Sequence, residues 1–389
     1  MPDFSVAQRL QKLPPYLFSE IDKKKKAAIA AGRDVINLGI GDPDTPTPQF
    51  IIDALYEHAR DPRTHQYAMD DGQPELREAI ARWFARRYGV DLAVDGEIFP
   101  TIGSKEAIGH FPLAFLDPGD AALIPVPGYP PYRSGTIFAG ADPIYMPLKA
   151  GNGFMPDLGA ISEADAGRAK IIFINSPNNP TGAVAGEDFY RELVAFAEKH
   201  DLIIASDAAY AELAFDGKEP ISLLSIPGAR ERTIEFHSWS KTFNMTGWRI
   251  GFAAGSAELC AGLGRIKSNL DSGIFTAIQL AAINALEKYD EFVPGLRDMY
   301  QKRRDAFCDK LAGLGLDVPK PEATFYVWFP TPGGLPSFEV AGRILEEADV
   351  VLIPGAGFGE PGEGFLRAAL TVSVERLEEA AERIGRIDW

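Results

Sequence analysis

Lys241 is the residue of this sequence whose surroundings best suit covalent chemistry. Small hydroxyl side chains precede it at Ser238 and Ser240, and Arg249 follows eight positions later. Short apolar runs before and after this stretch predict strands, so the lysine is expected in a loop at a strand end, where α/β proteins place their chemistry. It is either a solvated loop lysine or an amine that forms a Schiff base with an aldehyde cofactor. In the second interpretation the neighbouring cation lowers its pKa, and the hydroxyls and the arginine hold a cofactor phosphate. The spacing alone leaves both interpretations open.

Asp207 is a second candidate, because it follows the apolar run 202–205 and lies 34 positions before Lys241. An aspartate after such a run is commonly a turn former or a helix cap. The functional alternative is a carboxylate that pairs with the nitrogen of a pyridine ring and keeps it protonated. A protonated ring accepts electrons from a substrate carbanion far better than a neutral ring does. Tyr210, three positions further on, can hydrogen-bond to a phenolic oxygen of the same ring.

Two more polar residues are associated with apolar strands. Asn179 stands in the turn after the strand expected at 170–175, where an asparagine can donate a hydrogen bond to a phenolate oxygen. Arg367 interrupts the apolar run 365–370, and a buried arginine requires a partner. This arginine is either part of a structural ion pair or a bidentate clamp on the α-carboxylate of an amino acid, whose shape a guanidinium matches.

Gly103, Ser104 and Lys105 lie where an expected strand at 98–102 changes into a helix. Unpaired backbone N–H groups and the helix dipole make such a start an anion site. On its own, an ordinary helix start is the favoured interpretation, and the pattern is not a Walker loop. The glycines within 355–359 follow a strand but open no helix, so we reject a dinucleotide-binding fingerprint there.

The stretch around Lys241 resembles the lysine signature of class I and II aminotransferases, because it reads Ser238-x-Ser240-Lys241-x-x-x-Met245-Thr246-Gly247-Trp248-Arg249-x-Gly251. Further motifs of that family follow in order over almost the whole chain. The resemblance implies pyridoxal 5'-phosphate (PLP) as the cofactor, bound to Lys241, with Asp207 at the ring nitrogen. It also assigns the other positions: Gly103, Ser104, Lys105, Ser238, Ser240 and Arg249 to the phosphate, Tyr129 to stacking on the ring, Asn179 and Tyr210 to the phenolic oxygen, and Gly41, Asn179 and Arg367 to the substrate carboxylate.

The resemblance implies transamination between an L-amino acid and a 2-oxo acid, with Lys241 as the base that moves the α-proton. Tyr67 matches the tyrosine that reaches the cofactor phosphate of the other subunit, which implies a homodimer with shared active sites. The motifs at 38–44, 102–106 and 127–130 most resemble the branch of the family that transfers an amino group between LL-diaminopimelate and 2-oxoglutarate in lysine biosynthesis.

Several alternatives are compatible with the same residues. A broad aspartate, alanine or aromatic aminotransferase would use them equally, because they address the cofactor and the α-carboxylate rather than the side chain. A PLP-dependent carbon–sulfur β-lyase or a decarboxylase is possible on the same fold. A non-enzymatic regulatory domain is disfavoured, since no basic region or DNA-binding extension is present.

These residues require an α/β frame to position them. The resemblance predicts PLP-dependent fold type I, with a large doubly wound, mostly parallel sheet domain at 47–287 and a smaller α/β domain built from 1–46 and 288–389. Apolar spacing predicts helices at 48–60 and 188–200 and a long helix from residue 291. A break at 269–275 predicts a loop near the site or the dimer interface.

Composition supports this frame and excludes other classes. A chain of 389 residues, 46% hydrophobic, is long enough for two domains. A net charge of −16 argues against nucleic-acid and anionic-membrane partners. Cys260 and Cys308 provide no disulfide framework, and no Cys/His cluster predicts a metal. The absence of an apolar run of about 18 residues predicts no membrane span, and we expect a cytoplasmic protein.

Overall fold

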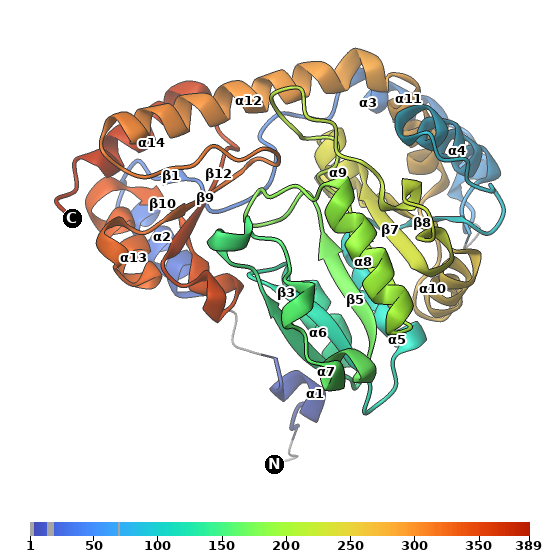
Figure 1. The fold of residues 1–389 in the computed structure, drawn as a ribbon. Coiled ribbons are helices and arrows are strands. Elements are labelled where there is room, and N and C mark those ends of the chain that lie inside the picture. Colours follow the sequence, from blue (N-terminus) through green and yellow to red (C-terminus); the bar gives the residue numbers. More distant parts are fainter. Residues whose placement is uncertain (1–3, 14–18, 69–70) are drawn as a thin grey trace.

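A seven-stranded sheet forms the centre of the molecule in the computed structural model, which describes residues 4–13, 19–68 and 71–389 (Figure 1). The strand order is β2-β8-β7-β6-β5-β3-β4, and only β8 runs antiparallel to its neighbours. The strands are β2 (Ile98–Thr101), β3 (Ala121–Val126), β4 (Asp142–Pro147), β5 (Ala169–Asn175), β6 (Ile203–Asp207), β7 (Thr233–Ser238) and β8 (Gly251–Gly255). The expectation of a mostly parallel sheet is confirmed.

Apolar runs build the inner strands, and polar residues end them. Every residue of β7 is buried, as expected for a strand covered on both faces. Asn175, Asp207 and Ser238 are the last residues of β5, β6 and β7, and the strand register pairs Asn175 with Asp207. The carboxyl ends of three adjacent parallel strands therefore bring polar side chains to one edge of the sheet, where open α/β sheets bind ligands.

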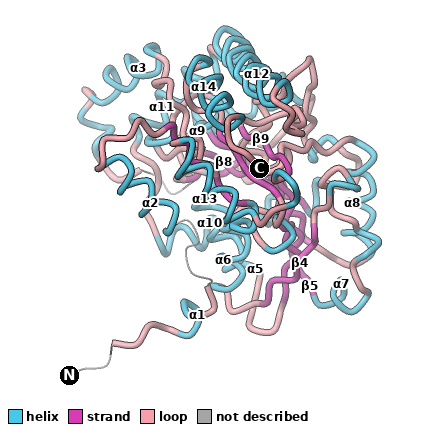
Figure 2. Tube along the Cα trace, turned by 90° about the vertical axis from the view of Figure 1, so that its left-hand side faces the viewer, coloured by secondary structure: helices cyan, strands magenta, loops and turns pink. Residues whose placement is uncertain are grey.

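Helices cover both faces of this sheet (Figure 2). One face packs against α5 (Ser104–Phe115), α6 (Pro130–Phe138) and α10 (Ala257–Leu270), and the other against α8 (Glu187–Lys199). The short helix α7 (Glu163–Arg168) directly precedes β5. At the β2 and β8 end of the sheet, α3 (Gln49–Ala59), α4 (Pro74–Tyr88) and α11 (Thr276–Glu287) share a further apolar core. A break falls within the predicted range 269–275, but it is limited to residues 271–275, because α10 continues to Leu270.

A smaller part is assembled from segments near both chain ends. Its antiparallel sheet has the order β11 (Ile353–Pro354), β12 (Phe365–Ala369), β9 (Tyr326–Pro330), and β1 (Ile36–Asn37) pairs in parallel with β10 (Val350–Val351). Helices α2 (Ser19–Ala30), α13 (Ser337–Ala348) and α14 (Val374–Gly385) surround these strands. Helix α12 (Tyr289–Gly313) runs along the top of Figure 1 from α11 to α14 and joins the two parts. The domain boundaries at 46/47 and 287/288 stay a prediction.

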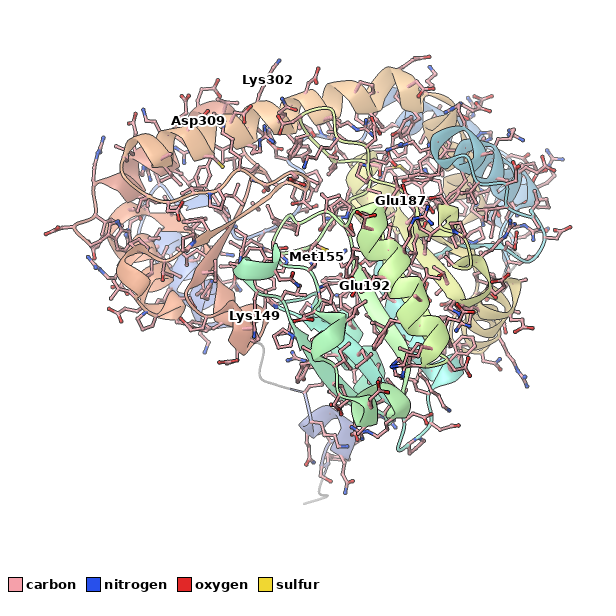
Figure 3. All side chains as sticks on the ribbon, in the orientation of Figure 1. Lys149, Met155, Glu187, Glu192, Lys302 and Asp309 are labelled. Carbon is pink, nitrogen blue, oxygen red and sulfur yellow. The ribbon has the colours of Figure 1, made fainter. Side chains whose placement is uncertain are left out.

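Side chains of both parts project into the region between them (Figure 3). The segment that carries Lys149 and Met155 lies beside the smaller part, and the Phe154 ring packs edge-on against the Phe365 ring at 5.6 Å. The remaining helical turns are α1 (Gln8–Gln11), α9 (Trp239–Thr242), η1 (Pro62–His65), η2 (Ala150–Asn152), η3 (Leu158–Ala160), η4 (Leu223–Ser225), η5 (Arg230–Arg232), η6 (Thr246–Trp248), η7 (Pro332–Gly334), η8 (Gly355–Phe358) and η9 (Glu360–Gly362). None of the helices in the described part of the chain combines the length and apolar character that a membrane crossing requires.

Candidate active site

A cavity of about 410 Å³ opens at the carboxyl ends of the central strands, a size that suits small-molecule sites. It gathers every residue predicted from the sequence except Gly103, Tyr67 and Arg367. Its lining residues are Gly41, Ser104, Lys105, Tyr129, Asn175, Asn179, Asp207, Ala209, Tyr210, Ser238, Ser240, Lys241, Thr246, Arg249 and Tyr326. These residues come from distant parts of the sequence, and the sheet edge brings them together.

Lys241 lies on the short helix α9 that follows β7 directly. Its side chain is half-buried, and Nζ donates a hydrogen bond to the Gly41 carbonyl oxygen at 2.9 Å. Burial lowers the pKa of this amine below its usual 10.5, and the charges of Arg249 and Arg367 act in the same direction. A lowered pKa increases the fraction of neutral amine, which is the nucleophilic form. The amine therefore suits covalent attachment to an aldehyde.

Asp207 presents a buried carboxylate to the cavity, with 4% of its surface exposed. Tyr132 donates its hydroxyl hydrogen to Oδ2 at 2.7 Å, and the Ala209 backbone N–H donates to Oδ1 at 3.1 Å. Burial raises the pKa of Asp207, against the opposing effect of these two hydrogen bonds and of His237. No cation of the described chain forms an ion pair with this carboxylate, which is costly for a buried charge. A protonated ring nitrogen in the cavity would supply the missing positive charge, so the site fits a pyridinium cofactor.

A tyrosine pair stands beside the lysine. The Tyr210 hydroxyl lies 3.2 Å from the Tyr326 hydroxyl, and burial raises the pKa of Tyr210 well above 10. Tyr210 therefore keeps its proton at neutral pH and is able to donate it in a hydrogen bond. The Tyr326 ring reaches Gly41, where an added Cβ would collide with its hydroxyl group. Close approach of a side chain to the backbone thus explains why position 41 is a glycine.

Arg367 lies at the edge of the cavity, buried on β12. Its Nη1 donates to Asn179 Oδ1 at 3.0 Å, and its Nη2 donates to the Gly39 carbonyl oxygen at 2.8 Å. The guanidinium carbon sits 4.2 Å from the centre of the Tyr326 ring and 4.8 Å from that of Phe358. This packing fixes the plane of the guanidinium group, which is the property that bidentate carboxylate binding requires.

The other side of the cavity has the properties of an anion cradle. Gly103, with φ +74°, immediately precedes α5, so the backbone N–H groups of Ser104 and Lys105 belong to its first turn. N–H groups in the first turn of a helix have no partner within the helix and are able to bind an anion. Arg249 adds a cation, and its Nη1 donates to the Thr246 carbonyl oxygen at 2.9 Å. A side chain at position 103 would overlap the Arg249 guanidinium, so glycine is needed here. Ser238 and Ser240 contribute hydroxyl groups to the same cavity.

One predicted residue lies apart from this cavity. Tyr67 is 93% exposed and contacts the solvent rather than the site of its own chain. Its assignment to the active site of a second subunit stays a prediction.

Sequence reasoning missed five residues of the site, among them Ala209, whose backbone N–H donates to Asp207. Asn175 donates to the Asp207 carbonyl oxygen at 2.9 Å and accepts from the Asn179 backbone N–H at 2.7 Å, so it orders two strand ends. Tyr132 and Tyr326 contact Asp207 and Tyr210 as described, and Thr246 lines the cavity. The spacing of Tyr132, three residues after Tyr129 at the start of a helix, was an available signal.

One cluster near the cradle resembles a metal site. Potential ligand atoms of Glu106, His110 and Asp271 lie within 4.8 Å of one another. However, the Lys267 ammonium lies 2.9 Å from Glu106 and 3.0 Å from Asp271, so a cation of the chain itself already occupies the position between the two carboxylates. We assign no metal to this cluster.

Comparison with known proteins places this geometry in context. The family model described as "Aminotransferase class I and II" matches residues 33–384. A protein of Syntrophobacter fumaroxidans named LL-diaminopimelate aminotransferase is 51% identical over 386 residues, which cover 99% of this chain and 100% of that protein. A protein of the same name from Desulforudis audaxviator is 52% identical over 99% of this chain and 100% of its own length. The substrate-bound structure of BacF from Bacillus subtilis superposes with a TM-score of 0.94 at 37% identity, covering 99% of this chain and 98% of that one.

Proposed function

The chain belongs to the class I and II aminotransferase family and is an aminotransferase of fold type I, and from that membership we propose that it uses pyridoxal 5'-phosphate to transfer an amino group between LL-diaminopimelate and 2-oxoglutarate. One observation carries the cofactor proposal. A buried aspartate without an ion-pair partner in the described chain and a lysine of lowered pKa line the same cavity.

When bound, the cofactor supplies a protonated ring that takes up negative charge from the substrate Cα. Asp207 would hold the proton on the ring nitrogen, and Tyr132 would hold Asp207 in its ionised form by donating to Oδ2. Tyr210 and Asn179 would donate hydrogen bonds to the phenolic oxygen. Tyr129 would pack against the ring face and fix its plane.

The anion cradle would bind the phosphate group. Its members are Gly103, Ser104, Lys105, Ser238, Ser240 and Arg249. Tyr67 from a second copy of the chain would complete it, so we propose a homodimer with shared active sites. The 93% exposure of this tyrosine in the single chain is compatible with the proposal, because it leaves the side chain accessible to a second copy.

Four residues would take part in substrate binding and proton transfer. Arg367 and Asn179 would bind the α-carboxylate of the amino acid, and Gly41, which has no side chain, would leave room for it. Lys241 Nζ would hold the cofactor at rest and, once displaced by the substrate amine, move the proton from Cα. Its present hydrogen-bond partner, the Gly41 carbonyl oxygen, belongs to the same turn as the Gly39 carbonyl oxygen, which accepts from Arg367.

The proposed substrate follows the two relatives named above, and a half-reaction experiment tests it. Cofactor-saturated protein is mixed separately with LL-diaminopimelate, aspartate, alanine and phenylalanine while the absorbance of the cofactor is followed. We expect the fastest spectral conversion with LL-diaminopimelate, and recovery of the starting spectrum on addition of 2-oxoglutarate. Conversion by aspartate but not by LL-diaminopimelate would refute the substrate and leave the aminotransferase class intact. Release of pyruvate from cystathionine in place of amino transfer would point instead to a β-lyase.

A further inference from the structure

A buried lysine outside the cavity connects the anion cradle to a neighbouring loop. Lys267 lies in the last turn of α10, and only 1% of its surface is exposed. Its Nζ donates hydrogen bonds to Glu106 at 2.9 Å and to both carboxylate oxygens of Asp271 at 3.0 and 3.1 Å. A buried ammonium is unfavourable unless its charge and its three donors are matched, and here they are. Lys267 does not line the cavity itself.

On one side the lysine holds the backbone of the cradle. Glu106 is the third residue of α5, and its Oε2 also accepts a hydrogen bond from the Ile102 N–H at 3.1 Å. Burial opposes ionisation of Glu106, but the hydrogen bond from His110 and the charge of Lys267 outweigh it and lower the pKa of this carboxyl. The carbonyl oxygen of the same Ile102 accepts from Arg249 Nη2 at 3.4 Å. The Glu106 carboxylate therefore holds the turn at 102–104 by its hydrogen bond to Ile102, and Lys267 holds this carboxylate in position.

On the other side the lysine holds the loop between α10 and α11. Asp271 begins this loop, and Phe275 ends it by packing edge-on against His65 at a ring distance of 5.7 Å. In α11, Gln279 Oε1 accepts from the Gln73 backbone N–H at 2.7 Å. His65 and Gln73 flank the stretch that carries the exposed Tyr67. Lys267, Glu106 and Asp271 thus connect the anion cradle of this chain with the region around Tyr67, the tyrosine proposed for the cradle of its partner.

We propose that Lys267 is a positioning residue whose ammonium fixes the phosphate-binding turn at 102–104 through Glu106 and sets it against the loop at 271–275. The inference rests on the proposed function, because it requires the cofactor phosphate at this turn. Its consequence is selective. Loss of the ammonium lowers the affinity of the turn for the phosphate group. The proposed contacts to the ring and the aldehyde, made by Asp207, Tyr210 and Lys241, are unaffected.

A comparison of PLP with pyridoxal, which lacks the phosphate, distinguishes this role from a general structural one. The full-length protein, freed of cofactor, is titrated with PLP and with pyridoxal while the absorbance of the bound aldehyde is recorded. The variants are Lys267→Met and the conservative Lys267→Arg. The matched control is Lys320→Met, because Lys320 also bridges two carboxylates, those of Asp305 at 3.1 Å and Asp309 at 2.9 Å, but lies in the smaller part.

We expect Lys267→Met to weaken PLP binding by about tenfold or more, the effect of losing one charge-assisted hydrogen bond that orders the turn. Pyridoxal binding should change by less than about twofold, and Lys267→Arg should restore most of the PLP affinity. Lys320→Met should leave both affinities unchanged. Glu106→Gln provides a second variant if Lys267→Met does not fold, since the amide oxygen is able to accept from Ile102 without attracting the lysine. It should show the same selective loss.

Three results would overturn the inference. Equal loss of PLP and pyridoxal affinity would assign Lys267 a purely structural role, and unchanged PLP affinity in a folded variant would remove its link to the cradle. In both cases the wild-type protein still binds PLP, so the proposed function stands. A wild-type protein that binds neither compound at Lys241 would overturn both the proposed function and this inference.

Discussion

Replacement of Asp207 by asparagine should stabilise the cofactor-free protein and impair the cofactor-bound one. In the absence of cofactor the carboxylate is 4% exposed and receives hydrogen bonds from Tyr132 and Ala209, and no cation of the described chain pairs with it. Burial raises its pKa above 3.8, which means that the ionised form lowers the stability of the fold. Asparagine has nearly the same shape without the charge. The variant removes the cost of the charge but keeps the packing.

The expected gain is modest and depends on pH. Relief of an unpaired buried charge, less the weakening of the hydrogen bonds to Tyr132 and Ala209, leaves about 1–2 kcal/mol at pH 7, or a rise of a few degrees in Tm. Because the folded pKa is raised, the native state binds more protons than the unfolded state between 3.8 and the folded value. The wild-type carboxyl therefore contributes stability below pH 3.8 that is lost as the pH rises through its folded pKa. The advantage of the variant must shrink as the pH falls from 7.5 to 4.5.

Thermal unfolding of both proteins, with and without cofactor, measures this effect. With cofactor bound the sign should reverse, because the ring nitrogen loses its counter-ion, and the rate of amino transfer should fall by about 100- to 1,000-fold. Glu212→Gln is the matched control. Glu212 is also buried, but Arg87 and Arg297 pair with it at 3.0 and 2.8 Å. Its loss should destabilise both forms by about 3 kcal/mol. A cofactor-free Asp207→Asn protein that is less stable than wild type at pH 7 would refute the reasoning.

Three further predictions concern the same cavity. Arg367→Met should raise KM for the amino acid by about 10- to 100-fold and lower kcat much less, because a charge-assisted carboxylate contact is lost. Steady-state kinetics measure both constants, and an unchanged KM would show that Arg367 does not bind the carboxylate. Gly41→Ala should abolish activity, because the added Cβ would collide with both the hydroxyl and the ring carbons of Tyr326, and Tyr326→Ala in the same chain should restore part of it. Full activity of the single variant would show that Tyr326 does not pack tightly against Gly41. The rate at which pyridoxal attaches to the cofactor-free protein should rise with pH and level off below pH 10.5, because burial lowers the pKa of Lys241 and only the neutral amine reacts. Stopped-flow absorbance measures this rate, and a rise that continues through pH 10.5 would contradict a lowered pKa.

The sequence was most informative where one residue does chemistry at the end of an apolar strand. Asp207 ends β6, and Lys241 and Asn179 follow the last residues of β7 and β5 by three and four positions. All three could be predicted as site residues because parallel strands end at the ligand-binding edge, and the run of apolar residues marks that end. Arg367 was identifiable for a related reason, since a charge within a buried strand demands a partner. The apolar residues 35–38 are a weaker guide to structure, because they form a strand only at Ile36–Asn37. The following residues leave the sheet to contact Arg367 and Thr371.

The residues that support these side chains could not be predicted in the same way. Tyr132 and Tyr326 are apolar in character over most of their surface, and tyrosines of this kind commonly occur in cores without any role. Only the packing of α6 and β9 against the strand ends shows that their hydroxyls reach Asp207 and Tyr210. The position of Lys267 beneath the anion cradle likewise depends on the contact between α10 and α5, which no local pattern encodes.

Covalent attachment of the cofactor at Lys241 is the most direct test of the account. Protein saturated with pyridoxal 5'-phosphate is treated with borohydride, digested and examined by mass spectrometry. The account predicts one reduced pyridoxyl phosphate adduct per chain, on the peptide that contains Lys241, and no adduct there in a folded Lys241→Ala variant. An unlabelled chain, or a label confined to other lysines, would contradict it.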